Sequence, residues 1–203
     1  MPLHATPPFR LILASGSFGR KCLMEEAGYP FEVKPANIDE PTEARLGDCR
    51  HYVGELAWLK AAAVAPQVDD GLVIAADTVG WLNGKVIGKP EDEADARRII
   101  KSLSGTVHEL WTGVCLWLRP GDWQFSWQER SLVRMKPLSD AEIDAYLKTR
   151  KWEGCSGAYA IQLPHDPYLT VEEGSVSNVI GLPMESLEKA LGWMAKVRGE
   201  RNA

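Results

Sequence analysis

The sequence lacks the features that would let a chain cross a membrane or hold nucleic acid nonspecifically. No apolar run in its 203 residues approaches the ~18 residues that a transmembrane helix needs. Lys and Arg number 23 against 28 Asp and Glu, so the chain has no cationic excess with which to bind a nucleic-acid backbone. A composition of 45% hydrophobic and 25% charged residues excludes wholesale disorder. We therefore expect a globular protein without stable contacts to membrane or nucleic acid.

Cysteine is also scarce, and its spacing excludes a common class of metal site. The chain has no C-x-x-C pair and no histidine pair at zinc spacing, which predicts reduced thiols in a cytoplasmic protein. No basic patch followed by an apolar stretch opens the sequence, so we expect no secretory signal. Residues 1–8 are expected to form a flexible leader, and residues 9–198 a single domain. The four scattered cysteines are Cys22, Cys49, Cys115 and Cys155.

Short strands and helices alternate along the chain, which predicts an α/β or mixed α/β protein. Residues 9–14 and 31–33 read as strands around a helix over 20–27. Apolar residues at three- and four-residue steps predict a helix over 48–65, and the apolar run 72–76 predicts a buried strand. Further expected elements are a hairpin at Asn83-Gly84, helices over 91–103, 139–147 and 183–197, and strands over 107–118, 125–135 and 169–171.

A small-residue segment, Ser15-Gly16-Ser17, follows the first strand and leads into Arg20. Small residues let a backbone approach a ligand closely, and free N–H groups at a helix start attract anions. This pattern is typical of a phosphate site, but an ordinary helix cap with surface cations fits it equally well. The chain has no G-x-x-x-x-G-K-[ST] loop and no G-x-S-x-G elbow, which excludes the P-loop and the common serine-hydrolase patterns.

Asp77 and Thr78 are expected to follow the end of the buried strand over 72–76. A carboxylate there can hold a divalent cation or accept a proton from water, although a simple capping role is the alternative. Lys89, between a glycine and a proline, suits a fixed charge against phosphate. Lys60 lies in the apolar stripe of its helix, so its ammonium either snorkels to solvent or points into a cleft. Glu40 is more often a loop residue than a metal ligand, but both remain open.

Taken together and in order, these blocks resemble the Maf family of nucleoside triphosphate pyrophosphatases from Leu11 to about Leu191. The blocks that carry the resemblance are Leu13-Ala14-Ser15-Gly16-Ser17, Phe31-Glu32-Val33, Ile38-Asp39-Glu40, Leu59-Lys60-Ala61, Ala75-Ala76-Asp77-Thr78, Gly88-Lys89-Pro90, Leu103-Ser104-Gly105-Thr106-Val107-His108, Thr112-Gly113-Val114, Gly157-Ala158-Tyr159-Ala160-Ile161-Gln162 and the run from Gly174 to Pro183.

The resemblance implies a mixed α/β fold with a twisted central sheet, flanking helices and a cleft between two lobes, and usually a homodimer. It implies hydrolysis of a nucleoside triphosphate between the α- and β-phosphates with Mg²⁺ or Mn²⁺, giving a monophosphate and pyrophosphate. Asp77 matches the family's catalytic carboxylate, and we take Asp77 with Glu40 as candidate metal ligands. The implied substrate-binding residues are Ser15, Arg20, Lys60, Thr78, Lys89 and Gln162.

Thr78 and Gln162 match positions that read the base in the branch of the family that acts on dTTP and UTP. The chain departs from the family where Phe18 and Gly19 replace the usual proline and first arginine. Two alternatives therefore stay open. One is a pyrophosphatase for 7-methyl-GTP or noncanonical purine nucleotides. The other is a nucleotide-binding regulator of cell division with weak or no catalysis.

Overall fold

A computed structural model of the chain describes residues 7–40, 48–161 and 166–201. Its seven strands form one sheet in the order β2-β1-β3-β5-β6-β7, with β4 beside β3. Strand β1 pairs in parallel with β2 and β3, whereas β3 to β7 pair antiparallel. The strands are β1 (Leu11–Leu13), β2 (Phe31–Val33), β3 (Gly71–Leu82), β4 (Lys85–Ile87), β5 (Val107–Arg119), β6 (Trp123–Met135) and β7 (Leu169–Glu173).

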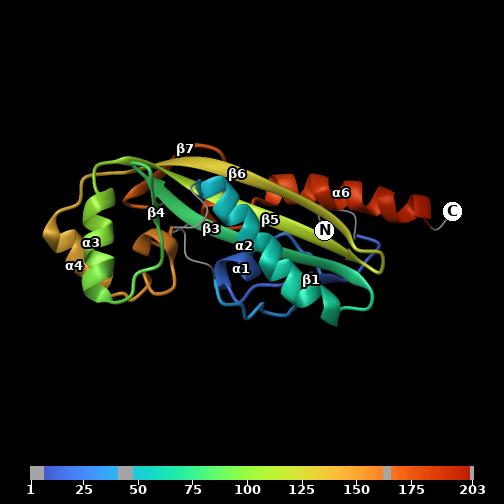
Figure 1. Cartoon of the computed structure of the whole chain (residues 1–203). Helices are drawn as coiled ribbons and strands as arrows, with labels where there is room; N and C mark the ends of the chain where they lie inside the picture. The colour runs from blue at the N-terminus through green and yellow to red at the C-terminus, as the bar shows by residue number, and fades with distance from the viewer. Residues whose placement is uncertain (1–6, 41–47, 162–165, 202–203) are drawn as a thin grey trace.

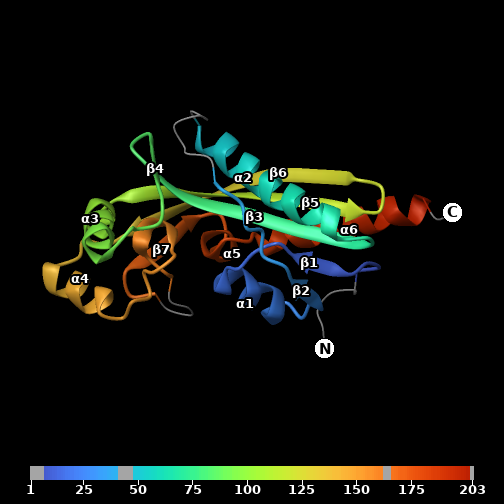
Figure 2. The same cartoon turned by 60° about the horizontal axis from the view of Figure 1, so that its bottom comes forward.

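The helices cover both faces of this sheet, as Figures 1 and 2 show, with α2 on one face and α1 with α5 on the other. Helices α3 and α4 lie together at one end of the molecule. The expected mixed α/β fold with flanking helices is thus confirmed. The helices are α1 (Phe18–Glu26), α2 (Cys49–Val64), α3 (Glu93–Leu103), α4 (Asp140–Leu147), α5 (Val176–Ile180) and α6 (Met184–Arg201), with short 3-10 turns η2 (Ala65–Gln67) and η3 (Ser156–Ala158).

Alternating side chains of β3 divide the core into two layers, because successive residues of a strand point to opposite faces. Leu72 and Ile74 pack in the cluster that contains apolar residues of α1 and α6. Val73 and Ala75 pack in the cluster that contains Ala57 and other residues of α2. The same alternation places the next two polar residues of the strand on different faces, the first on the α2 side and the second on the α1 side.

The prediction that β3 ends before Asp77 is wrong. Strand β3 continues to Leu82 because β5 pairs with it along its whole length, from Gly71 opposite Arg119 to Trp81 opposite Glu109. Asp77 and its neighbour therefore lie inside a strand and not at its tip. Asn83 and Gly84, both with positive φ, then form the predicted hairpin into β4.

On the opposite flank, β3 is paired only at its two ends in the described ranges. Strand β1 pairs with residues 72–74 of β3, and β4 pairs with residues 80–82. Between these two strands, residues 75–79 meet no strand of the described chain on that side. A pocket of about 980 Å³ includes this gap, and its lining comes from both the α1 end and the α3 end of the molecule. This pocket is the cleft expected between two lobes.

Candidate functional site

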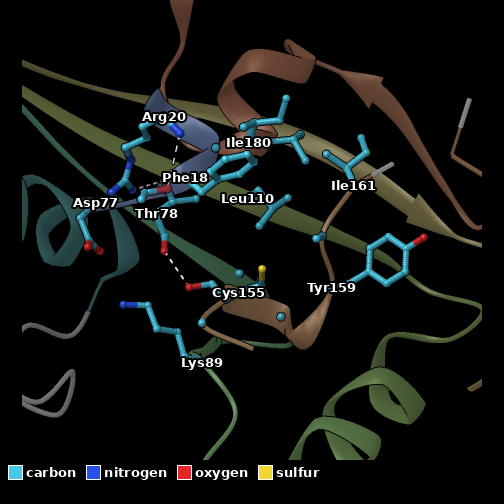
Figure 3. Close-up of a pocket in the computed structure, with 18 of the residues that line it drawn as sticks. Phe18, Arg20, Asp77, Thr78, Lys89, Leu110, Cys155, Tyr159, Ile161 and Ile180 are labelled. Atoms are coloured by element: carbon cyan, nitrogen blue, oxygen red, sulfur yellow. Dashed lines mark hydrogen bonds between the residues drawn. The ribbon is translucent and has the colours of Figure 1, made fainter. Parts of the chain in front are cut away.

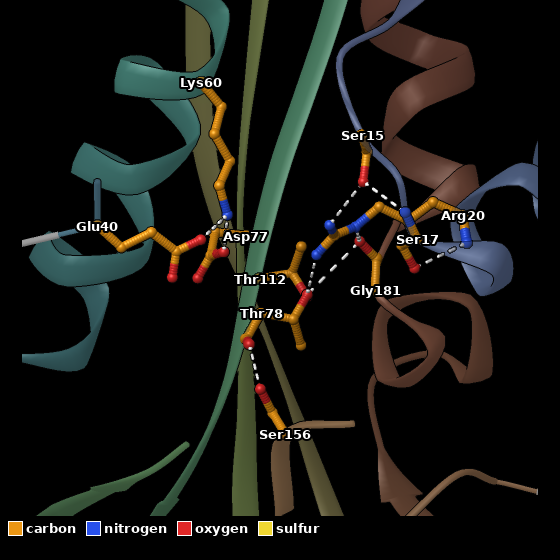
Figure 4. A network of polar contacts seen from close by, with 10 residues as sticks. All are labelled: Ser15, Ser17, Arg20, Glu40, Lys60, Asp77, Thr78, Thr112, Ser156 and Gly181. Carbon is orange, nitrogen blue, oxygen red and sulfur yellow. Dashed lines mark hydrogen bonds and ion pairs between the residues drawn. The ribbon is translucent and has the colours of Figure 1, made fainter. Parts of the chain in front are cut away.

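Asp77, on the α2 face of β3, is buried and lies in a cluster of three charged side chains (Figure 4). Lys60 of α2, only 8% exposed, donates a hydrogen bond from Nζ to Asp77 Oδ1. The same Nζ lies 2.8 Å from Glu40 Oε1. Of the two orientations that the sequence left open for Lys60, the structure has the one that points into the cleft.

Gly113 allows α2 to lie close enough for this contact. It is the cross-strand partner of Asp77 in β5. A Cβ atom at this position would lie 2.2 Å from the carbonyl oxygen of Val53 in α2. Any larger residue would therefore push α2 away from the sheet, and Lys60 away from Asp77. The sequence analysis quoted Gly113 only as part of a motif and missed this role, because spacing along one strand does not reveal what packs above it.

Glu40 responds to the positive charges around it. Partial burial by itself would raise the pKa of its carboxyl group, but the hydrogen bond and charge of Lys60, together with the charges of Lys89 and Arg20, outweigh burial. The net result is a pKa below the ordinary value for glutamate. Glu40 is therefore ionised at neutral pH, so two carboxylates bind one ammonium group.

Arg20, from the first turn of α1, lies on the other face of β3 and is 9% exposed. The helix starts after Ser17, whose side chain accepts a hydrogen bond from the backbone N–H of Arg20. The guanidinium donates from Nε to Gly181 O at 2.7 Å, from Nη1 to Ser15 Oγ at 3.0 Å and from Nη2 to Thr78 Oγ1 at 3.1 Å. Within residues 7–40, 48–161 and 166–201, Arg20 forms no ion pair with a carboxylate.

Burial without a paired carboxylate has an electrostatic consequence for Arg20. Burial lowers the pKa of its guanidinium, while the more distant charges of Asp77 and Glu40 oppose that shift. An arginine nevertheless stays protonated in proteins. The site therefore contains a buried positive charge held by neutral oxygens, which is the arrangement an anionic ligand would complete.

A relay of hydroxyl groups holds Thr78 in place behind Arg20. Thr112 donates its hydroxyl proton to Asn178 O at 3.1 Å, so its oxygen is free to accept from Thr78 at 2.8 Å. Thr78 in turn accepts from Arg20. Asn178 belongs to α5, a five-residue helix that the sequence analysis did not predict because it is too short to show a period.

Lys89 lies on the opposite side of the pocket, on an exposed loop after β4. The loop is anchored where the backbone N–H of Gly157 donates to Gly88 O at 3.0 Å. Next to it, Ser156 Oγ donates to Thr78 O at 2.9 Å. These contacts attach the 3-10 turn η3 to both β3 and the loop that carries Lys89.

The predicted site residues thus come together wherever the structure describes them. Gln162 and residues 1–6 of the expected leader lie outside the described residues. The pocket lining includes two hydroxyl or carboxylate groups of β3, two lysines, a buried arginine and the serine after β1. These are Asp77, Thr78, Lys60, Lys89, Arg20 and Ser15.

The donor set of the pocket fits a divalent cation only when a ligand contributes to its coordination. In the described part of the chain, no group of three or more His, Cys, Asp or Glu side chains is placed to hold a metal ion. Asp77 and Glu40, however, already converge on one cation, the ammonium of Lys60. Mg²⁺ is commonly held by one or two carboxylates together with substrate phosphates. The two carboxylates fit such an ion.

Three cationic side chains and a buried carboxylate line this one pocket, an arrangement that suits a polyanionic ligand. The comparisons with known proteins agree with this class of site. The family model for Maf-like proteins matches residues 10–194, and the chain belongs to this family. None of the helices in the described ranges is long and apolar enough to span a bilayer.

Several relatives carry the name dTTP/UTP pyrophosphatase. The relative from Rhodopirellula baltica is 40% identical over 197 residues, covering 94% of this chain and 85% of its own. That from Anaeromyxobacter sp. is 44% identical over 187 residues, covering 90% of this chain and 88% of its own. That from Ruminiclostridium cellulolyticum is 35% identical over 181 residues, covering 89% and 94%.

Among solved structures, the chain matches the nucleoside-triphosphatase / dITP/XTP pyrophosphatase from Mycobacterium abscessus. The match has a TM-score of 0.42 and 13% sequence identity, and covers 95% of this chain and 96% of the other.

Proposed function

We propose that the protein hydrolyses nucleoside triphosphates between the α- and β-phosphates, with a preference for dTTP and UTP. The observation that carries the proposal is that Arg20, Lys60 and Lys89 line one pocket together with the buried Asp77. The pyrimidine preference is supported by relatives that carry the name dTTP/UTP pyrophosphatase over about nine tenths of this chain.

Arg20 binds the triphosphate in this proposal, together with the N-terminal end of α1. The guanidinium is buried without a carboxylate partner, so an incoming phosphate oxygen supplies its missing negative charge. The positive end of the α1 dipole adds a second anion-binding element. Lys89, on its anchored loop, contributes a third positive charge from across the pocket.

Asp77 orients the attacking water and accepts its proton, since its carboxylate is the buried acceptor at the opening in the sheet. Lys60 holds this carboxylate in place through their direct hydrogen bond. As the α-phosphorus is attacked, negative charge grows on the phosphate oxygens, and Arg20 and the two lysines stabilise it.

Asp77 and Glu40 would hold a divalent cation, Mg²⁺ or Mn²⁺, beside the phosphates. When bound, such an ion adds positive charge at the phosphates and lowers the pKa of bound water. Lys60 then has a second role, because it keeps the two carboxylates together when no ion is present.

Thr78 contributes in this proposal by positioning Arg20. Its hydroxyl proton goes to Thr112, and its oxygen accepts from the guanidinium. Gln162 is proposed to read the pyrimidine base, as the family resemblance implies. We further propose that the enzyme acts in the cytoplasm as a homodimer and protects the nucleotide pool.

Pyrophosphate release from a panel of dTTP, UTP, CTP, 7-methyl-GTP and ITP, with Mg²⁺ or Mn²⁺, tests the proposal. We expect release from dTTP and UTP to exceed that from the other three nucleotides. A clear preference for 7-methyl-GTP or ITP would contradict the pyrimidine assignment. Tight binding of every triphosphate without pyrophosphate release would instead identify a nucleotide-binding regulator.

A further inference from the structure

The pocket has a second half whose chemistry the phosphate-binding residues do not explain. Beyond Thr78, its lining is largely apolar (Figure 3). On the floor, Gly80 of β3 is the cross-strand partner of Leu110 in β5, and both line the pocket. Tyr159 and Ile161 line the same region. Charged phosphate groups gain no free energy from contact with such an apolar surface, whereas a flat, weakly polar group does.

Phe18 is the least covered large apolar side chain in the described part of the molecule. It is 79% exposed, whereas the other exposed large hydrophobic side chains there range from 37% to 45%. It nevertheless lines the pocket and opens α1, two residues before Arg20. A phenylalanine ring gains free energy when apolar contact replaces water. Its position beside the anion site therefore points to a ligand as the missing contact.

Gly19, the residue after Phe18, lets the first turn of α1 pack closely against α5. A Cβ atom at Gly19 would lie 2.9 Å from Ile180 Cγ2 of α5. The first turn of α1 therefore rests directly on α5, with no space for a side chain between them. Ile180 thus occupies the space that a larger residue at position 19 would need. Where the family usually has a proline and an arginine, this chain therefore has an aromatic ring, at Phe18, and a glycine that packs on Ile180.

We propose that the Phe18 ring packs against the nucleobase of the bound triphosphate. The inference rests on the proposed function and adds a base-contacting residue to it. Arg20 anchors the phosphates from the same helical turn, so the apolar half of the pocket is left for the base. Aromatic side chains stack on every base because each base has a π-face. Phe18 therefore contributes affinity for nucleotides in general and little discrimination among bases.

Equilibrium binding of a nonhydrolysable nucleotide, α,β-methylene-UTP, tests the role of Phe18 without requiring turnover. Inorganic tripolyphosphate serves as a probe that has the phosphates but no base. We expect Phe18→Ala to weaken binding of the nucleotide about tenfold. Binding of tripolyphosphate should change less than about twofold, and Phe18→Tyr should restore nucleotide affinity to near the wild-type value.

Phe125→Leu is the matched control for Phe18→Leu, because Phe125 is another exposed phenylalanine, 37% exposed, and does not line the pocket. Only Phe18→Leu should weaken nucleotide binding. Unchanged nucleotide affinity in Phe18→Ala, or an equal loss for tripolyphosphate, would overturn the inference. A wild-type protein that binds α,β-methylene-UTP through Phe18 but releases no pyrophosphate from dTTP or UTP would overturn the proposed function and leave this inference standing.

Discussion

Asp77 and Thr78 are neighbours in β3, yet their side chains lie in opposite electrostatic surroundings. On the Asp77 face, one ammonium group binds two carboxylates, so the cation is paired within the protein and negative charge is in excess. On the Thr78 face, Arg20 is surrounded by neutral oxygens and its charge is left uncompensated. The comparison teaches that one face pairs its cation with carboxylates of the protein, whereas the other leaves a cation available for an incoming anion.

The largest expected effect comes from removing the carboxylate of the Asp77 face. Asp77→Asn keeps the size of the side chain but removes the proton acceptor, and Lys60 keeps Glu40 as a partner. We expect pyrophosphate release from UTP to fall about a thousandfold, with an unchanged circular dichroism spectrum. Asp69→Asn, an exposed carboxylate outside the pocket, is the control. Full activity in Asp77→Asn would refute the catalytic assignment.

The two faces should respond differently when their cations are removed. Lys60→Met leaves Asp77 buried without its ammonium partner, so we expect the free energy of unfolding to fall by about 3 kcal/mol. Arg20→Met breaks three hydrogen bonds to neutral oxygens, but it also removes a buried charge that has no carboxylate partner. The two effects offset in part, so the net cost is about 1 kcal/mol. Urea unfolding of both variants measures this difference.

Loss of Arg20 should affect ligand binding much more than it affects the stability of the fold. We expect Arg20→Met to weaken binding of tripolyphosphate about a hundredfold, because the buried charge is then missing. Should Arg20→Met destabilise the fold as much as Lys60→Met, Arg20 would be a structural cation and the contrast between the faces would fail.

His108 lies in β5 on the same face of the sheet as Thr78, and it should make the stability of the protein depend on pH. Its imidazole is buried, and its Nδ1 has no hydrogen-bond partner in the described part of the chain. Burial lowers the pKa of His108 to about 4. The unfolded chain therefore takes up the proton first as the pH falls below the ordinary histidine pKa, and stability is lost until the pH passes the folded value.

As the pH falls from about 7.5 to about 5, the lowered pKa of His108 should reduce the unfolding free energy of the wild-type protein by about 2 kcal/mol. Urea unfolding across this range should show a correspondingly weaker pH dependence for His108→Asn. His51→Asn is the control, since the His51 side chain is 79% exposed. Equal pH dependence in wild type and His108→Asn would contradict a lowered pKa at this position.

The smallest expected effect concerns the hydroxyl relay behind Arg20. Thr112→Val removes the acceptor for the Thr78 hydroxyl and the donor to Asn178 O. We expect a loss of about 1 kcal/mol in unfolding free energy, and a KM for UTP that rises a few fold because Arg20 is held less firmly. Thr112→Ser retains the hydroxyl, so its KM should stay close to that of wild type.

Local patterns predicted much of the fold. The capping box at Ser139 and Glu142 starts α4 as expected, because both of its hydrogen bonds are formed within one turn. Asp48 likewise caps α2 at the predicted place. The end of β3 could not be predicted, since pairing with β5 extends the strand through residues that are not a continuous apolar run.

The sequence by itself determined the candidate residues of the proposed site: a small-residue segment before a cationic helix, a carboxylate beside a threonine, and two lysines far apart in the chain. These follow from side-chain properties and from periods of two to four residues, which act locally. Only the tertiary structure decided three contacts. Lys60 points into the pocket, Gly113 lets α2 pack closely on the sheet, and the carbonyl oxygen of Gly181 accepts a hydrogen bond from Arg20. Such contacts join segments distant in sequence, and they depend on strand register and close packing, which no local pattern encodes.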